Sequence, residues 1–227
     1  MAQKKNSKLA ERIKTDPLFE RTRKNIAEFR RASIASKLLL DALRPAGVNA
    51  KDGRLFSRLQ SQMFEVLKSD NVNSRGDRLV SKGNMRLIRG FDFNLNGKLS
   101  SLLYIQPTAS IDRATGIMKA ELPAFIPKDM LKAPLNATHF TIACAAAEID
   151  FVEGTFVTTT AYTAELSHNN EATTAINLTN TVTANSTKWL VLAVGIMFND
   201  RTNEVSDKFK AGRFNALSVV AVDSPAV

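Results

Sequence analysis

Two kinds of hydrophobic periodicity divide the chain. Between residues 19 and 43, apolar and small residues recur three and four positions apart, the spacing of one face of an α-helix. This stripe comprises Phe19, Thr22, Ile26, Phe29, Ser33, Ser36, Leu40 and Leu43. Asp16-Pro17 precedes it, a pair typical of an N-cap followed by proline in the first helical turn. Arg44-Pro45-Ala46-Gly47 is expected to end the helix.

A second helix is predicted from about residue 54 to residue 69. Its apolar positions recur at helical spacing and comprise Leu55, Phe56, Leu59, Met63, Val66 and Leu67. Residues 71–77 are rich in Asn, Ser, Gly and Asp, which favour turns. We therefore expect two helices that pack on each other, followed by a linker.

From about residue 87 the pattern changes to alternation, and Thr, Val, Ile and Phe become frequent, as in strands. Asn96-Gly97, between residues 91–95 and 99–106, predicts a β-hairpin. Further strands are expected at 118–122, 140–146, 155–165, 173–179, 188–198 and 214–222. Residues 188–198 are apolar on both faces, which indicates a central, buried strand.

The predicted fold class is α+β. A basic helical arm or hairpin of two helices would occupy residues 1–80, and an antiparallel β-sandwich of about eight or nine strands would occupy residues 87–227. The sandwich is expected to be jelly-roll-like or immunoglobulin-like, because short strands follow one another without intervening helical periodicity.

Composition narrows the class of protein. Of the 227 residues, 44% are hydrophobic and 23% charged, which is typical of globular domains. The longest apolar run, 189–198, is about half of what a membrane-spanning helix needs, and the basic N-terminus leads into no apolar segment. We therefore expect a cytoplasmic protein without membrane contact. One cysteine excludes an intramolecular disulfide, and two histidines with one cysteine exclude the common zinc sites.

The net charge of +9 is unevenly distributed. Residues 1–90 hold 21 Lys and Arg against 9 Asp and Glu, whereas residues 91–227 hold 10 against 13. The candidate binding cations on the first predicted helix are Arg21, Arg23, Lys24, Arg30, Arg31 and Lys37. Such a cluster can contact nucleic-acid phosphates, or an acidic protein surface such as that of a neighbouring copy.

The chain offers few candidates for catalysis. Cys144 is predicted to lie in the core, His139 on the opposite side of its strand, and His168 in a polar surface loop, so no Cys-His pair is implied. Glu148 and Asp150 share one strand face and could form an acid/base pair or a weak Ca²⁺ site, but an exposed acidic edge is the commoner arrangement. No phosphate-binding, dinucleotide-binding or nucleophile motif is found, so we expect neither an enzyme nor a bound cofactor or metal.

Several segments resemble a family of uncharacterised bacterial proteins of Bacteroidota type. The likeness is carried by residues 15–23 (TDPLFERTR) with Asn25, Glu28 and Phe29, and extends through residues 42–44, 52–55, 111–116 and 214–217. The resemblance implies a bacterial source and a helical segment followed by a β-rich domain. It implies no activity and no catalytic residues.

Three functions are compatible with these observations. The favoured hypothesis is a non-enzymatic structural subunit that self-assembles into a filament, tube, shell or phage-like particle, with copies of itself as partners. Its candidate assembly stripe comprises Phe19, Ile26, Phe29, Leu40 and Leu43. The alternative is an architectural protein that binds nucleic acid through phosphate contacts. A ligand-binding sandwich or a hydrolase using Glu148 and Asp150 is less favoured, so no small-molecule substrate is expected.

Overall fold

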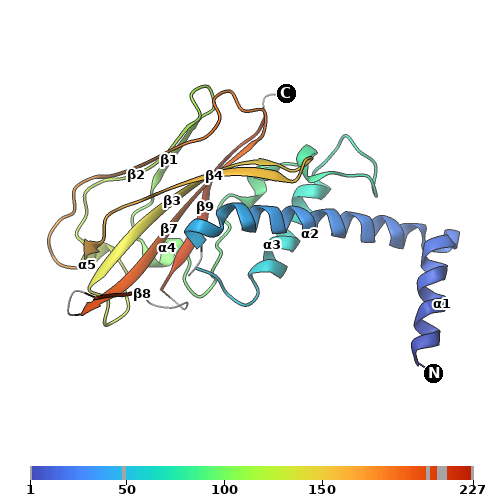
Figure 1. Ribbon diagram of the computed structural model, residues 1–227, viewed down its shortest axis with the longest axis horizontal. Helices are drawn as coiled ribbons and strands as arrows, with labels where there is room; N and C mark the ends of the chain where they lie inside the picture. The colour runs from blue at the N-terminus through green and yellow to red at the C-terminus, as the bar shows by residue number, and fades with distance from the viewer. Residues whose placement is uncertain (1, 48–49, 203–204, 209–213, 226–227) are drawn as a thin grey trace.

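The computed structural model describes residues 2–47, 50–202, 205–208 and 214–225. Its helical elements are α1 (Ala2–Thr15), η1 (Pro17–Phe19), α2 (Glu20–Gly47), α3 (Leu55–Lys68), η2 (Val80–Lys82), η3 (Met85–Ile88), α4 (Leu99–Leu102) and α5 (Pro127–Met130). Its strands are β1 (Thr108–Asp112), β2 (Ile117–Leu122), β3 (His139–Asp150), β4 (Thr155–Tyr162), β5 (Leu166–Ser167), β6 (Ile176–Thr181), β7 (Trp189–Thr202), β8 (Val205–Lys208) and β9 (Ala216–Asp223). Figure 1 shows helices leading into strands, which confirms the α+β class.

The two long predicted helices are confirmed. The Asp16 carboxylate accepts a hydrogen bond from the Leu18 backbone N–H and caps η1, and α2 then runs on to Gly47 with Pro45 inside its last turn. α3 matches the second predicted helix closely. α1 was not predicted, because few of its residues are apolar: Leu9 and Ile13 alone stand one helical turn apart.

Every pairing between the described strands is antiparallel. Three strands form the small sheet, in the order β1-β2-β6, and six form the large sheet. Within the large sheet β4, β3 and β7 are successive neighbours, and β9 and β8 pair with β7. β7 is fully buried from Leu190 to Val194 and lies between β3 and β9, so the predicted central strand is confirmed.

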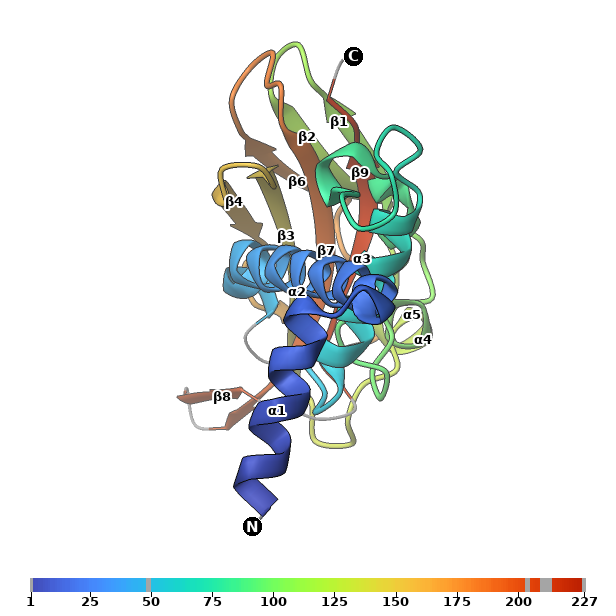
Figure 2. The ribbon, with the colours of Figure 1, turned by 90° about the vertical axis from the view of Figure 1, so that its right-hand side faces the viewer.

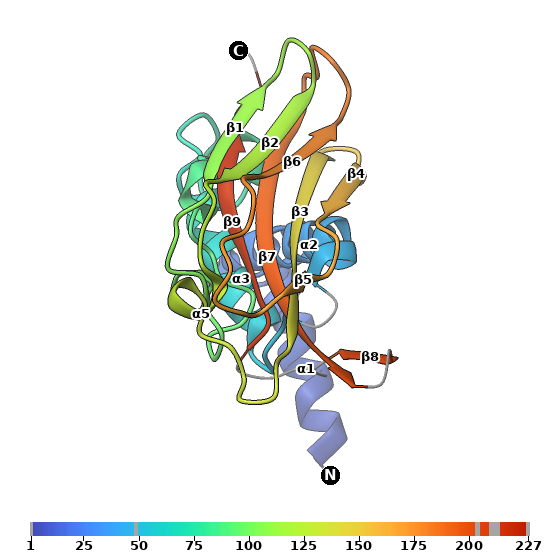
Figure 3. The same ribbon diagram turned by 90° about the vertical axis from the view of Figure 1, so that its left-hand side faces the viewer.

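The large sheet is the middle of three layers. On β3, Ala143 and Ala145 belong to one buried cluster with Leu39 of α2, whereas Ile142 belongs to another with Met118 of the small sheet. This division follows from the period of two along a strand. Figure 2 shows α2 and α3 in front of the large sheet, and Figure 3 shows the small sheet on its other side. A jelly-roll-like or immunoglobulin-like topology stays a prediction.

The proposed boundary between residues 1–80 and 87–227 also stays a prediction. Buried side chains of α2 and α3 share their cluster with Val80, Met85 and Ile88, and with strand residues of the large sheet. The C-terminal part of α2 therefore packs directly on the large sheet, and α3 packs on α2, η2 and η3.

The hairpin predicted at Asn96-Gly97 is wrong. Residues 90–93 instead run beside β9: the Phe93 N–H donates to the Leu217 carbonyl at 2.9 Å, and the Val219 N–H donates to the Phe91 carbonyl at 3.1 Å. The Asp92 carboxylate accepts from the Leu99 N–H at 3.2 Å, at the start of α4. Pairing with a distant strand thus replaces the local partner that the pattern indicated.

Candidate assembly surface

The start of the chain projects away from the rest of the molecule (Figure 1). From residue 9 to residue 27 every side chain is exposed or half-buried, and we call residues 2–27 the projecting arm. Figure 1 shows α1 at the far end of α2, away from both sheets. Leu9, Leu18 and Ile26 are exposed apolar residues on the arm, and Leu18 retains 85% of its accessible surface.

The bend of the arm is held by local hydrogen bonds. The Arg23 guanidinium donates to the Ile13 carbonyl at 2.9 Å and to the Asp16 carbonyl at 2.8 Å, and so satisfies groups at the C-terminal end of α1. Arg12 forms an ion pair with Asp16 at 3.2 Å. The hydrogen bond from the Leu18 N–H, helped by Arg12, lowers the pKa of Asp16. The orientation of α1 is thereby fixed by contacts within the arm itself.

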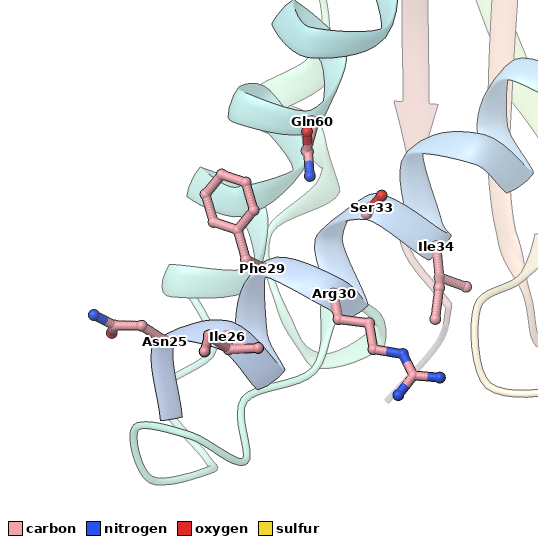
Figure 4. A pocket seen from close by; sticks show the side chains of 7 residues that line it. All are labelled: Asn25, Ile26, Phe29, Arg30, Ser33, Ile34 and Gln60. Atoms are coloured by element: carbon pink, nitrogen blue, oxygen red, sulfur yellow. The ribbon is translucent and has the colours of Figure 1, made fainter. Parts of the chain in front are cut away.

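A shallow apolar hollow continues the exposed surface beyond the arm. Ile26, Phe29 and Ile34 line it from α2, and Gln60 closes it from α3, as Figure 4 shows. The hollow has a volume of about 500 Å³. The Phe29 ring packs on Phe64 of α3 with ring centroids 5.1 Å apart, yet about half of its surface stays accessible. An apolar surface of this kind can bury against another molecule.

The predicted assembly stripe is exposed at its N-terminal end and buried at its C-terminal end. Ile26 and Phe29 are exposed, and Phe19 is half-buried at the bend of the arm. Leu43 is fully buried in the helix–sheet cluster and half-buried Leu40 packs against it. The structure therefore brings Ile26 and Phe29 to one surface and assigns Leu40 and Leu43 to the interior side.

The six predicted binding cations fall into two groups, according to whether they have a partner within the chain. Three have partners within the chain: Arg23 holds the bend, Lys24 pairs with Glu20 at 2.7 Å, and Arg31 donates to the carbonyls of Gly76 and Arg78. The other three, Arg21, Arg30 and Lys37, are exposed and contact no ionic or hydrogen-bonding partner within the described residues.

A buried ion pair that the sequence did not reveal anchors the linker to α2. Glu28 is fully buried and accepts hydrogen bonds from the Gly76 N–H at 2.7 Å and from the Arg78 guanidinium at 2.7 and 2.8 Å. The hydrogen bond from Arg78 lowers the pKa of Glu28, although burial opposes this effect. Helical spacing places position 28 beside the stripe but gives no sign of a partner fifty residues away.

The acidic residues on β3 have structural roles. Glu148 is buried, which by itself raises its pKa, but hydrogen bonds from Thr183 and Ser186 lower that pKa below the ordinary value. Asp150 accepts from the Val152 and Glu153 backbone N–H groups and holds the turn before β4. The expected exposed acidic edge is therefore wrong for Glu148.

The nucleophile candidates do not come together. Cys144 is fully buried, as predicted, and burial raises the pKa of its thiol to about 12. His139 contacts Thr138. His168 is not a surface residue as expected: both ring nitrogens are buried and its ring packs edge-on to Phe198. In the described part of the chain, no three His, Cys, Asp or Glu side chains are placed to hold a metal ion.

The helices and the comparisons with known proteins complete the description. No helix among the described residues combines the length and the apolar character needed to cross a membrane. Searches against protein-family models, curated proteins and solved structures find no match to this chain.

Proposed function

We propose that this protein is a non-enzymatic structural subunit that self-assembles, with the projecting arm of one copy docked on a neighbouring copy. The observation that carries the proposal is the run of residues 9–27, in which no side chain is buried. Assembly would explain why a folded chain keeps a long helical segment outside its own core.

The energetic argument rests on the length of α1. A helix of 14 residues is marginal in water even for favourable sequences, and packing of one face normally stabilises it. α1 offers Leu9 for such packing, and Leu18 and Ile26 extend the apolar surface along the arm. Each of these side chains contributes about 1.5–3 kcal/mol when it is fully buried.

Charge favours a second copy as the partner. Residues 1–90 carry a large positive excess and residues 91–227 a small negative one, so the arm of one copy is attracted to the strand-rich part of another. A contact between two different surfaces of the same chain is head-to-tail, and repetition of it produces a ring or an open filament. A filament, tube, shell or phage-like particle is therefore the expected product.

The test replaces the exposed apolar residues of the arm in the full chain. We expect the double variant Leu18→Gln/Ile26→Gln to lower the molar mass measured by light scattering after size exclusion, because it weakens the docked surface. The control is Leu135→Gln, since Leu135 is fully exposed and lies in the strand-rich part of the chain. An arm variant that keeps the wild-type mass, or a wild type that runs as a 24.9 kDa monomer, contradicts the proposal.

The unpaired cations favour one alternative function, the binding of nucleic-acid phosphates. Arg21, Arg30 and Lys37 are the candidates, because they have no partner in the described residues. If they contact phosphates, replacing all three by Gln reduces the slope of log affinity against log salt by about 3 on duplex DNA. The control triple Lys98→Gln/Lys128→Gln/Lys132→Gln removes the same charge from exposed positions elsewhere. An equal effect of both triples rejects this alternative.

A further inference from the structure

One edge of the large sheet lacks the usual protection against pairing. β4 pairs with β3 along its full length, from Thr155 opposite Asp150 to Tyr162 opposite Ala143, and no described strand pairs with its other side. Figure 3 shows it at the rim of the molecule. Edge strands are normally protected by charged side chains, proline or bulges. Residues 155–162 (TFVTTTAY) contain no charged residue, and their register with β3 has no interruption.

The hydrogen-bonding phase of β4 shows which backbone groups face outward. The Thr163 N–H donates to the Ile142 carbonyl at 3.0 Å, in continuation of the same register, so residue 163 faces β3. Backbone groups of successive residues alternate sides in an antiparallel ladder. Residues 155, 157, 159 and 161 therefore bond to β3, and residues 156, 158, 160 and 162 point their N–H and C=O groups away from it.

The neighbouring strand of the small sheet extends the neutral edge. β6 is the terminal strand of its sheet, and its sequence INLTNT also contains no charged residue. The Thr159 hydroxyl donates to the Thr181 carbonyl at 3.3 Å, so the two edges lie side by side. Phe156, Val157 and Tyr162 are each more than 40% exposed on this rim. The result is an uncharged strip with exposed large apolar groups on a chain of net charge +9.

We propose that β4 pairs antiparallel with β4 of a second copy, about a two-fold axis at Thr159, so that the two large sheets form one continuous sheet. A second copy is the occupant because the strip carries no charged side chain, so two identical strands meet there without like charges opposite each other. An identical strand in antiparallel orientation also supplies the matching donors and acceptors.

The register about Thr159 follows from two requirements. Each residue whose backbone N–H and C=O point outward must lie opposite another such residue of the second copy. The two-fold axis must therefore pass through a residue and cannot pass midway between two residues. An axis at Thr159 places Phe156 opposite Tyr162 of the second copy, and aromatic cross-strand pairs stabilise antiparallel sheets. It also makes the two Thr159 residues a non-hydrogen-bonded pair, with Cα atoms about 4.5 Å apart.

This pairing rests on the proposed function and adds a second interface to it. A two-fold contact closes after two copies, whereas the head-to-tail docking of the arm repeats without limit. Together the two contacts would join dimers into an extended assembly.

A disulfide at the axis tests the pairing in the full chain. Thr159→Cys places two thiols within the Cα separation that disulfides accept, whereas the native Cys144 is buried and does not react. We expect mild oxidation to convert most of Thr159→Cys to a covalent dimer on a non-reducing gel, and to leave the wild type monomeric. Ser110→Cys, at an exposed position on β1, is the matched control. Equal cross-linking of Thr159→Cys and Ser110→Cys overturns the proposal.

A second pair of variants removes the pairing without a new thiol. Thr160→Pro deletes an outward-facing N–H and leaves the bonds to β3 intact, and an edge strand accepts proline at such a position. We expect Thr160→Pro to lower the molar mass of the assembly relative to Thr160→Ala, with the circular dichroism spectrum unchanged. Equal masses for the two folded variants count against edge pairing.

The two experiments test the two interfaces independently. If Thr159→Cys does not cross-link but Leu18→Gln/Ile26→Gln lowers the mass, edge pairing is wrong and the function of the arm stands. If Thr159→Cys cross-links but the arm variant keeps the wild-type mass, the pairing stands and the arm is not the assembly element.

Discussion

At the scale of single residues, the Glu28–Arg78 pair connects α2 to the linker that follows α3. Removal of one partner from a buried ion pair leaves the other charge uncompensated, which costs about 3 kcal/mol. We therefore expect Glu28→Gln to lower the free energy of unfolding by about this amount in urea titrations. Glu20→Gln is the control, because its ion pair with Lys24 is exposed and is screened by solvent. An equal decrease in the free energy of unfolding for the two variants would show that the buried pair stabilises the fold no more than the exposed pair.

Asp70 predicts a specific sensitivity to acid. Burial by itself raises its pKa, but hydrogen bonds from Asn73, Leu79 and Val72 lower the pKa from 3.8 to about 2. Because the folded state has the lower pKa, the stabilisation is complete above the ordinary value and is lost as the pH falls from about 4 to 2. The shift corresponds to about 2 kcal/mol.

The measurement is urea unfolding as a function of pH. Asp70→Asn is expected to be about 2 kcal/mol less stable than wild type at pH 7, and the difference between the two proteins should shrink as the pH falls from about 4 to 2. A difference that stays constant over that range would assign the effect of the substitution to packing and not to the charge.

Sequence reasoning succeeds for residues whose role is set by neighbours along the chain. Met118, Ala120 and Leu122 are buried on one face of β2, as their alternation predicts, and Asp16 caps the turn that it precedes. Glu28 was missed because its partner lies fifty positions away. Position along a strand gave the face of Glu148 but not its burial.

At the scale of elements, the packing of the end of η2 against α3 depends on the lack of a side chain at Gly83. A Cβ atom at this position would lie 2.0 Å from the Val66 carbonyl oxygen near the end of α3. We expect Gly83→Ala to lower the free energy of unfolding by about 1–3 kcal/mol, the usual cost of overpacking. Gly53→Ala is the control, since a Cβ atom there meets nothing within 4 Å. Comparable urea midpoints for the two variants would refute this prediction.

Whole elements are predicted from the sequence where periodicity is strong. α2 and α3 show helical periodicity, β3 shows alternation, and β7 is apolar on both faces, as its burial requires. The hairpin at residues 91–106 fails because β9, more than a hundred positions later, pairs with residues 90–93. α1 was not predicted because a helix without a buried face has no apolar stripe in its sequence.

At the scale of the whole molecule, the position of the helices on the large sheet could not be predicted from the pattern. Both faces of β3 are apolar. This pattern predicts that the strand is buried on two sides, but it does not predict which elements cover each side. Alanine at 143, 145 and 147 lets α2 approach the sheet closely. The projection of the arm could not be predicted either, because the apolar stripe continues from exposed Ile26 to buried Leu43 without a break in its spacing.

Self-association is the central claim of this account. The most direct measurement is the molar mass of the full chain by light scattering over a range of protein concentrations, at low and high salt, with the 260/280 absorbance ratio recorded. We predict a mass that is a multiple of 24.9 kDa and survives high salt, with a protein-like ratio, because apolar side chains and backbone pairing form the contacts. A monomer of 24.9 kDa at every concentration would contradict the account.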